Sequence, residues 1–476
     1  MNVNELIPNR INGLEVIYTD ADVITVDNVV SIVNDAIDTH NRNKRKIQHL
    51  WNIYKGKQKI YQRTKEKASR DDICNKVCEN HAYEIVQFKT GQSYGEPIQY
   101  ISRKDDEFIN NAVDELNDYM TDADKHAKNV KAGEWQSATG TAFQAIQITN
   151  DDIPYRIICP SPLNTFIIYS SETEEPMLSV QILEDSNGND YYRCYSKNME
   201  FKIAGGELVA SRLHVFGDVP IVEYPNNWER ISDIGLVEDL LNAINAYQSN
   251  RLDSVEQFVS SWIKFVNCEV DSEQFEKMKM SGALVVKSNN GSEHKADVDV
   301  ITQELNQSET QIAKDDLWNN VLTILAIPNK QNNTGGDSQG AVVLRNGWDH
   351  SKSRADLKDT VIKVSEKRLA KIVLNILRIS GNDLKISARD FDVQINHSPT
   401  DNMVVKCQSL QYLLQCGIHP LIAIKTVGLW GDAEKTFLIS EPYLDNLWKT
   451  VNDAEIEKQT EEAINLLKNA NKEVDN

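Results

Sequence analysis

Side chains that could do chemistry are present in this sequence, but their spacing matches no catalytic motif. The glycines of residues 335–340 have no lysine beside them to reach a phosphate, so this stretch is not a phosphate-binding loop. The nine histidines are isolated, and none belongs to a His-Glu-x-x-His motif. Neighbouring residues on a helix or strand point in different directions, so adjacent acids do not by themselves form a two-metal nuclease site. Such pairs occur at Asp71-Asp72, Asp105-Asp106 and Asp151-Asp152.

Two other spacings resemble metal sites but have simpler explanations. Cys74 and Cys78 would share one helical face, but no second pair with zinc-like spacing follows, so we interpret the seven scattered cysteines as reduced structural thiols. Residues 185–190 resemble the start of a calcium loop, yet Asp190 occupies the glycine position and Lys197 the place of the final glutamate. The Asn-Gly pair there predicts a β-hairpin. We expect no catalytic residue, no metal and no cofactor, while a convergence of distant acids stays open.

The composition is that of a folded protein with an acidic excess. The 476 residues include 51 Lys plus Arg and 71 Asp plus Glu, which gives a net charge of −20, and 40% of the residues are hydrophobic. This length is enough for about two to four domains. No basic start with a following apolar run opens the chain, and no apolar stretch reaches the roughly 18 residues of a membrane span. We therefore expect a soluble intracellular product.

A basic segment interrupts the acidic chain. Residues 40–70 contain eleven Lys or Arg and one acid, Glu66, so this segment carries +10 and the rest of the chain −30. Such a segment can contact nucleic acid, or it can be a solvated helix face that pairs with acidic neighbours in the same assembly. Interleaved apolar residues, among them Trp51 and Tyr61, favour the packed helix face.

The periodicity of apolar residues predicts an α+β fold that is mainly helical. Residues 26–54, 71–93 and about 105–131 have helical spacing. Residues 141–225 contain short β-branched runs between turn clusters, which predicts a meandering antiparallel sheet. The strongest helical signal covers residues 233–266, whose apolar stripe would extend over about 50 Å at 1.5 Å per residue.

The rest of the chain alternates short mixed elements with helices. The short elements expected are a helix at Ser272–Met280 and strands at Ala283–Lys287, Val298–Thr302 and Leu384–Ile395. A helix from about Ser308 to Ala326 ends before Pro328. A polar linker then leads into a helical stretch from Ser338 to Ile379, in which Gly340 and Gly347 favour a kink. Further helices are expected at about 400–416, 420–428 and 433–472.

Five short motifs follow one another along most of the chain: Trp51–Gly56, Lys89–Ile98, Val219–Asn227, Ile327–Asn329 and Ser338–Ala341. Their order resembles the portal proteins of tailed bacteriophages, specifically the type found in Gram-positive siphophages. The first is similar to the family's aromatic-Tyr-x-Gly segment and the second to its Gly-x-Pro stretch, and the third precedes a long helix as it does in that family. The last two, with a glycine-rich linker between them, look like its tunnel loop and the start of its tunnel helix.

The resemblance implies a portal fold with wing, stem, clip and crown regions and a long kinked tunnel helix. The wing would cover residues 12–232 and return at 356–395. The stem would consist of the helices 233–268 and 303–327, with the clip at 269–302 between them. The tunnel loop and the start of the tunnel helix would occupy residues 328–355, and the crown residues 396–476.

The same resemblance implies a structural channel protein. Family members form a homo-oligomeric ring, usually of about twelve subunits, at one capsid vertex, and double-stranded DNA is packaged and ejected through its axial channel. The implied partners are the terminase large subunit, the major capsid and scaffold proteins and a head-completion adaptor, with no membrane. The implied location is the virion, after assembly in the host cytoplasm. The alternatives are a phage-encoded metal-dependent nuclease and a helical assembly adaptor.

Two groups of residues would carry this function. The resemblance assigns Asn329, Lys330, Gln331, Asn332 and Asn333 to a DNA-facing tunnel loop, and Tyr247, Phe258 and Trp262 to a subunit interface in the stem. Residues 233–266 and 303–327 each carry a net charge of −3. That sign suits a channel for sliding DNA, because contacts of Lys and Arg with phosphates hold a duplex strongly. Lys330 is the only cation of residues 328–337, so the loop could touch DNA without clamping it.

Overall fold

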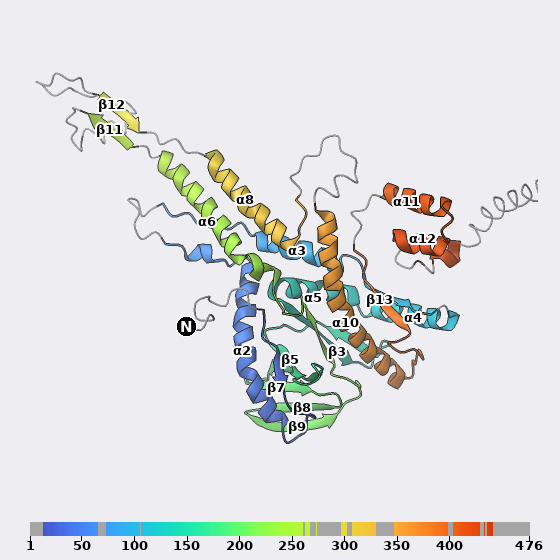
Figure 1. Ribbon diagram of the computed structural model, residues 1–476. Coiled ribbons are helices and arrows are strands. Elements are labelled where there is room, and N and C mark those ends of the chain that lie inside the picture. Colours follow the sequence, from blue (N-terminus) through green and yellow to red (C-terminus); the bar gives the residue numbers. More distant parts are fainter. Residues whose placement is uncertain are drawn as a thin grey trace, which may run out of the picture.

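The computed structural model describes residues 13–64, 73–104, 106–259, 262–266, 273, 297–301, 307–329, 347–397, 403–428, 433 and 436–440. Within this part of the chain, an α/β body carries two long helices that run side by side away from it and lead into a two-stranded ribbon (Figure 1). The predicted mixture of helices and sheets is confirmed. None of the described helices is both long enough and apolar enough to cross a membrane.

Helix α2 (Val29–Tyr54) packs against a six-stranded sheet of strand order β1-β5-β6-β7-β8-β9. Its strands are β1 (Ile17–Thr19), β5 (Thr165–Ser170), β6 (Pro176–Glu184), β7 (Asp190–Tyr195), β8 (Met199–Ala204) and β9 (Glu207–Leu213). The β1–β5 pair is parallel, and the other pairs are antiparallel. The hairpin predicted from the Asn-Gly pair is confirmed: it joins β6 to β7, and Gly188 has a φ of +81°.

The main core of the body lies around helix α10 (Trp348–Ser380), whose residues Ile362, Leu369, Val373 and Leu377 are fully buried. These positions recur four or seven residues apart, as on one face of a helix. The elements that share this core are α3 (His81–Tyr94), α4 (Glu107–Asp122), α5 (Lys125–Thr139), the strand pair β2 (Gln99–Ser102) and β13 (Phe391–Gln394), and the sheet of β10 (Ile221–Pro225), β3 (Thr141–Ile148) and β4 (Tyr155–Ile158).

The projecting helices are α6 (Asp233–Val259) and α8 (Gln307–Leu325). The ribbon at their far end pairs β11 (Trp262–Val266) with β12 (Asp297–Ile301) in antiparallel register. Helices α11 (Met403–Gln415) and α12 (Pro420–Val427) pack on each other near the C-terminus, and the short 3-10 helix η1 (Lys59–Gln62) follows α2. The predicted helices 26–54, 308–326, 400–416 and 420–428 and the strands in 298–302 and 384–395 are therefore confirmed.

Several predicted boundaries are wrong. The helix expected over residues 71–93 begins only at His81, so Cys74 and Cys78 do not share a helical face. The helix expected over 105–131 is two helices, α4 and α5, because Asp124 adopts a left-handed φ of +54° between them. The single sheet expected over 141–225 is divided between the six-stranded and the three-stranded sheet.

Two long helices differ from their predicted bounds in the described residues. The helix expected over 233–266 ends at Val259, and Trp262–Val266 forms strand β11, because its aromatic and β-branched side chains favour a strand once β12 pairs with it. The helix expected over 338–379 begins in the described chain at Trp348. Gly347 has a φ of +79° and precedes this helix, so the kink expected at Gly347 inside it is wrong. Residues 338–346 with Gly340, the strand expected at 283–287, and most of the helices expected at 272–280 and 433–472 lie outside the described residues.

Candidate functional site

The projecting helix pair is firmly packed where it leaves the body. Val237, Leu241 and Ile244 of α6 lie in one apolar cluster with Val321 and Leu325 of α8. Residues of α2, α3 and α5 belong to the same cluster, so both helices are anchored in the body at this end. Burial of these side chains stabilises the pair by roughly 1.5–3 kcal/mol for each large aliphatic residue.

Farther from the body, apolar side chains of the pair lie at the surface. The exposed fractions are 41% for Tyr247, 40% for Leu252 and 38% for Val255 on α6, and 68% for Ile312 on α8. We call these four residues the apolar strip. These side chains are the candidates for an interface on the helix pair, because covering them with another surface would remove apolar area from water.

A polar strap, residues 73–80, runs antiparallel to the middle of α6. Three of its backbone amides donate to three side chains of the helix, in the pairs Asn75–Asp253 (2.7 Å), Val77–Ser249 (3.0 Å) and Glu79–Asn245 (2.8 Å). Every second strap residue meets every fourth helix residue, because two extended residues and four helical residues both advance about 6 Å. These bonds give three amides of the strap acceptors outside a helix, and α3 begins only at His81, after the strap.

The strap also holds α8. Lys314 Nζ lies 2.5 Å from Glu79 Oε1, in an ion pair that is about one-fifth exposed. The ring of Trp318 stacks on that of His81 with centroids 4.1 Å apart. Sequence reasoning missed these residues, because the side chains that meet are more than 200 positions apart along the chain and no local pattern connects them.

The negative charge of the pair is only partly exposed. Asp253 is 3% exposed and forms an ion pair with Arg63 at 3.0 Å. Asp233 accepts a hydrogen bond of 2.7 Å from Ser137 Oγ and of 3.3 Å from Asn226 Nδ2. These two carboxylates serve the protein's own packing, whereas Asp316 of α8 is exposed to solvent. The net charge counted from the sequence therefore overstates the charge available on the surface of the pair.

The expected interface residues lie on two kinds of element. Tyr247 is on α6 within the apolar strip, and Phe258 is in the last turn of the same helix. Trp262 begins strand β11, so its assignment to a stem helix is wrong. Asn329 is the one described residue of the expected DNA-facing loop, and its side-chain amide donates to Asn319 Oδ1 at 2.8 Å. Lys330, Gln331, Asn332 and Asn333 lie outside the described residues.

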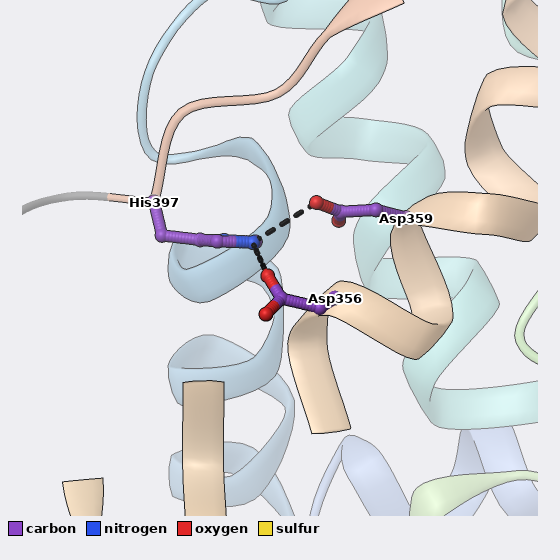
Figure 2. A group of neighbouring side chains, drawn as sticks. All are labelled: Asp356, Asp359 and His397. Carbon is purple, nitrogen blue, oxygen red and sulfur yellow. Dashed lines mark ion pairs between the residues drawn. The ribbon is translucent and has the colours of Figure 1, made fainter. Parts of the chain in front are cut away.

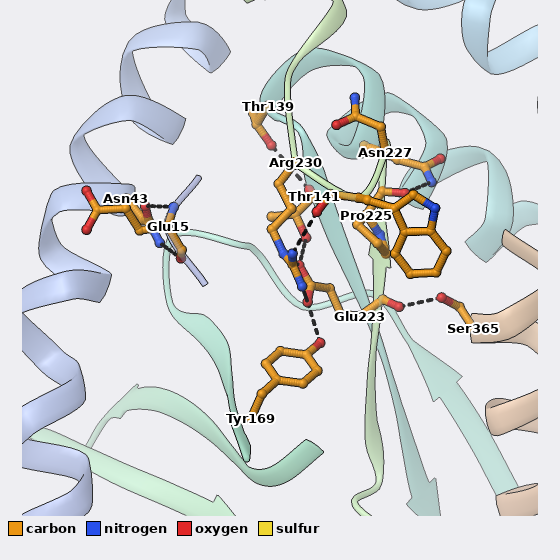
Figure 3. A network of polar contacts seen from close by, with 12 residues as sticks. Glu15, Asn43, Thr139, Thr141, Tyr169, Glu223, Pro225, Asn227, Arg230 and Ser365 are labelled. Carbon is orange, nitrogen blue, oxygen red and sulfur yellow. Dashed lines mark hydrogen bonds and ion pairs between the residues drawn. The ribbon is translucent and has the colours of Figure 1, made fainter. Parts of the chain in front are cut away.

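One buried carboxylate in the body, that of Glu223, is surrounded by hydrogen-bond and ion-pair partners. Glu223 lies between Arg230, Tyr169 and Thr141, with its carboxylate 2.8 Å from Arg230 Nε and 2.5 Å from the Tyr169 hydroxyl (Figure 3). Burial alone would raise the pKa of Glu223, but the Arg230 charge and these hydrogen bonds outweigh burial and lower it. Such a saturated carboxylate stabilises the fold between β10 and β5 and offers no free base for catalysis.

A second buried ion pair connects α5 with α10. Lys125 Nζ lies 2.6 Å from Glu366 Oε1, and the two side chains are 6% and 0% exposed. The other oxygen of Glu366 accepts a hydrogen bond of 3.0 Å from the Tyr100 hydroxyl on β2. Three elements are thus fixed to one another by one carboxylate, which is again a structural use of charge.

Comparison with known proteins places the chain in a family. The family model described as "Phage portal protein, SPP1 Gp6-like" matches residues 34–412, more than half of the chain. No curated protein matches. Solved structures with a loose overlap include the neck of an empty GTA particle computed with C6 symmetry, at 10% identity and a TM-score of 0.45, covering 74% of this chain and 90% of that chain. The virion of a native gene transfer agent (GTA) particle gives 9% identity, a TM-score of 0.43 and the same coverages.

The matched range 34–412 contains most of α2, the projecting pair, α10 and most of α11. The chain belongs to the family of SPP1 Gp6-like phage portal proteins.

Proposed function

We propose that this portal protein forms a closed ring of about twelve copies at one capsid vertex, and that double-stranded DNA is packaged and ejected through the axial channel of the ring. The apolar strip on α6 and α8 is the observation that carries the ring. A head-to-tail interface that closes on itself covers the strip of each copy with the next copy. The specific type, that of Gram-positive siphophages, is part of the proposal and is supported by the order of the five sequence motifs.

The regions of the portal are proposed with the bounds that the family resemblance implies. We assign the wing to residues 12–232 and 356–395, the stem to 233–268 and 303–327, the clip to 269–302, the tunnel loop with the start of the tunnel helix to 328–355, and the crown to 396–476. The stem helix itself ends at Val259, and β11 with β12 forms the transition into the clip. The loop from Asn329 to Asn333 would face DNA.

The partners in this proposal are the terminase large subunit, which would supply ATP hydrolysis, the major capsid and scaffold proteins, and a head-completion adaptor. Portal proteins are structural and non-enzymatic components of the capsid, so the nuclease alternative is wrong. As a phage portal protein, the chain is a component of the virion. Its assembly in the host cytoplasm belongs to the proposal.

Ring formation can be tested directly on the purified full chain. Negative-stain microscopy should show rings with a central hole, and native mass spectrometry should give a mass that is a multiple of 54.0 kDa. Replacement of Tyr247, Phe258 or Trp262 by Ala should shift the protein toward monomers, because each change removes apolar area that the neighbouring copy would cover.

The matched control for Tyr247→Ala is Tyr18→Ala, since Tyr18 of β1 is exposed to a similar extent, 49%, but lies away from the helix pair. The control variant should keep the ring. Intact rings in all three stem variants would contradict the assignment of the stem interface, and a monodisperse monomer of the unaltered chain at high concentration would contradict the ring itself.

A further inference from the structure

Two carboxylates and one imidazole converge beside helix α10. Asp356 and Asp359 are three residues apart on this helix and therefore share a face, and His397 follows strand β13 (Figure 2). His397 Nε2 lies 3.0 Å from Asp359 Oδ2 and 3.5 Å from Asp356 Oδ1. One potential ligand atom from each residue lies within 4.8 Å of the others.

The other ring nitrogen of His397 fixes the orientation of the imidazole. Nδ1 lies 2.8 Å from the backbone carbonyl oxygen of Gln92 at the end of α3. A carbonyl oxygen only accepts, so Nδ1 carries the proton and Nε2 is left facing the two carboxylates. Gln92 is itself held by α10, because its side-chain amide donates to the backbone oxygen and the hydroxyl of Ser351 at 3.0 and 2.9 Å. Histidine ligands of metal ions have this kind of second hydrogen bond.

Two atoms of the group are buried and lack a hydrogen-bond partner among the described residues: His397 Nε2 and Asp359 Oδ1. Nε2 stands within ion-pair distance of both carboxylates but makes no hydrogen bond with either. The Asp359 side chain is only 8% exposed, so water does not solvate its carboxylate freely. An Nε2 that faces two carboxylates requires a positive charge, supplied either by a proton on Nε2 or by a cation bound between the three groups, and the buried, unpartnered Asp359 Oδ1 leaves a ligand atom for the cation.

We propose that Asp356, Asp359 and His397 bind one divalent transition-metal ion, of which Zn²⁺ is the best match. Ligands at about 2.1 Å from a tetrahedral Zn²⁺ stand about 3.4 Å from one another, close to the separations found here. The imidazole favours Zn²⁺ over Mg²⁺ and Ca²⁺, which prefer oxygen ligands. No sequence pattern indicated this site, because Asp359 and His397 come together only in the fold, and the proposal departs from the expectation of no metal.

The ion would connect α10 to the C-terminal helices. His397 is the last described residue before α11, and Asp356 and Asp359 lie about two to three turns after α10 begins at Trp348. Metal binding would therefore fix the point at which residues 396–476 leave the body, and would do so whether or not the chain forms a ring. The role of the ion is structural: it holds two segments of the chain together.

The test measures metal content and thermal stability of the full-length protein. After chelation with EDTA and dialysis, titration with Zn²⁺ should load one equivalent of tightly bound metal per chain, as measured by elemental mass spectrometry. The bound metal should also raise the melting temperature. Titration with Mg²⁺ should do neither at the same concentration. Asp356→Asn is the informative variant, because the Asp356 side chain is 58% exposed and its replacement leaves the packing intact. It should weaken Zn²⁺ binding at least tenfold, as should His397→Gln.

Two exposed residues of the same helix provide matched controls, Asp349→Asn and His350→Gln, which should bind Zn²⁺ as the unaltered chain does. Replacement of Zn²⁺ by Co²⁺ should give a visible absorption band in the controls and not in Asp356→Asn. Equal Zn²⁺ affinity in all four variants would overturn the proposal. So would a failure of Zn²⁺ to bind or stabilise the unaltered chain, because the histidine would then be held between the carboxylates by a proton alone.

Discussion

His40 illustrates how a single buried side chain couples the fold to pH. It is 1% exposed on α2, its ring stacks on Phe166 of β5 at 4.4 Å, and its Nε2 lies 3.1 Å from the backbone oxygen of Leu163. Burial lowers the pKa of His40 from 6.5 to about 4, against the opposing effect of the Leu163 carbonyl. The imidazole is thus neutral in the folded protein at pH 7, and it packs as an aromatic ring.

The unfolded chain binds a proton at His40 below pH 6.5, while the folded chain does so only near pH 4. The stability that the neutral ring contributes is therefore complete above pH 6.5 and is lost as the pH falls toward 4, by at most about 3 kcal/mol. We expect urea denaturation of His40→Gln to show a smaller loss of unfolding free energy across this interval than the unaltered chain.

The control is His49→Gln, whose effect should have the opposite sign. His49 donates to Glu238 at 2.9 Å, and this hydrogen bond raises its pKa. Its small contribution is present below pH 6.5 and is lost as the pH rises through its folded pKa. Identical pH profiles for His40→Gln and the unaltered chain would show that His40 does not titrate in this way.

The strap of residues 73–80 contacts both α6 and α8 and holds them in place. A segment without regular secondary structure must place its amide groups elsewhere, and here they bond to side chains of α6. Ser249 is the middle of the three helix residues, is fully buried, and also donates to Asn245 O at 2.8 Å. The strap and helix α6 are therefore one structural unit.

Ser249→Ala should leave the Val77 amide without an acceptor at a cost of about 1–3 kcal/mol. Hydrogen exchange measured by mass spectrometry should then be faster in a peptide that covers residues 73–80, with little change in the six-stranded sheet. Ser254→Ala on the same helix is the control and should leave exchange of the strap unchanged. Unaltered protection of the strap in Ser249→Ala would mean that the Val77–Ser249 bond does not hold it.

In the proposed ring, the net charge of −20 per chain would govern how the ring interacts with DNA. A ring of about twelve copies would carry about −240, that is 12 × −20. At physiological salt, repulsion between such a ring and phosphates reaches only about 8 Å. In the proposed channel, this repulsion would keep a centred duplex away from the wall without preventing its entry.

Asp316→Lys should raise the affinity of the purified ring for double-stranded DNA and make it steeply salt-dependent, because each new cation that contacts a phosphate releases counterions. Fluorescence anisotropy with a labelled duplex measures both quantities. Asp27→Lys changes the net charge equally at an exposed position before α2 and should have little effect. Equal gains in both variants would indicate that DNA responds to total charge and not to the exposed face of α8.

The local sequence determined those elements whose turn residues or apolar periodicity lie within a few residues of one another. The Asn-Gly hairpin, the apolar periodicity of α2 and α8 and the stop before Pro328 all depend on neighbours in the chain, and the structure has them where they were predicted. The order of short motifs also pointed to the portal family, because a family's elements keep their order along the chain.

Tertiary structure alone decided the rest. The strap bonds join residues 166 to 178 positions apart, the end of α6 depends on a strand partner that begins at Asp297, and His397 meets Gln92 across 305 positions. Periodicity describes which face of a segment is apolar and carries no information on the distant groups that will satisfy its backbone or share its charge. For that physical reason the sequence indicated the family and the helices, and only the fold brought together the strap and the candidate metal site.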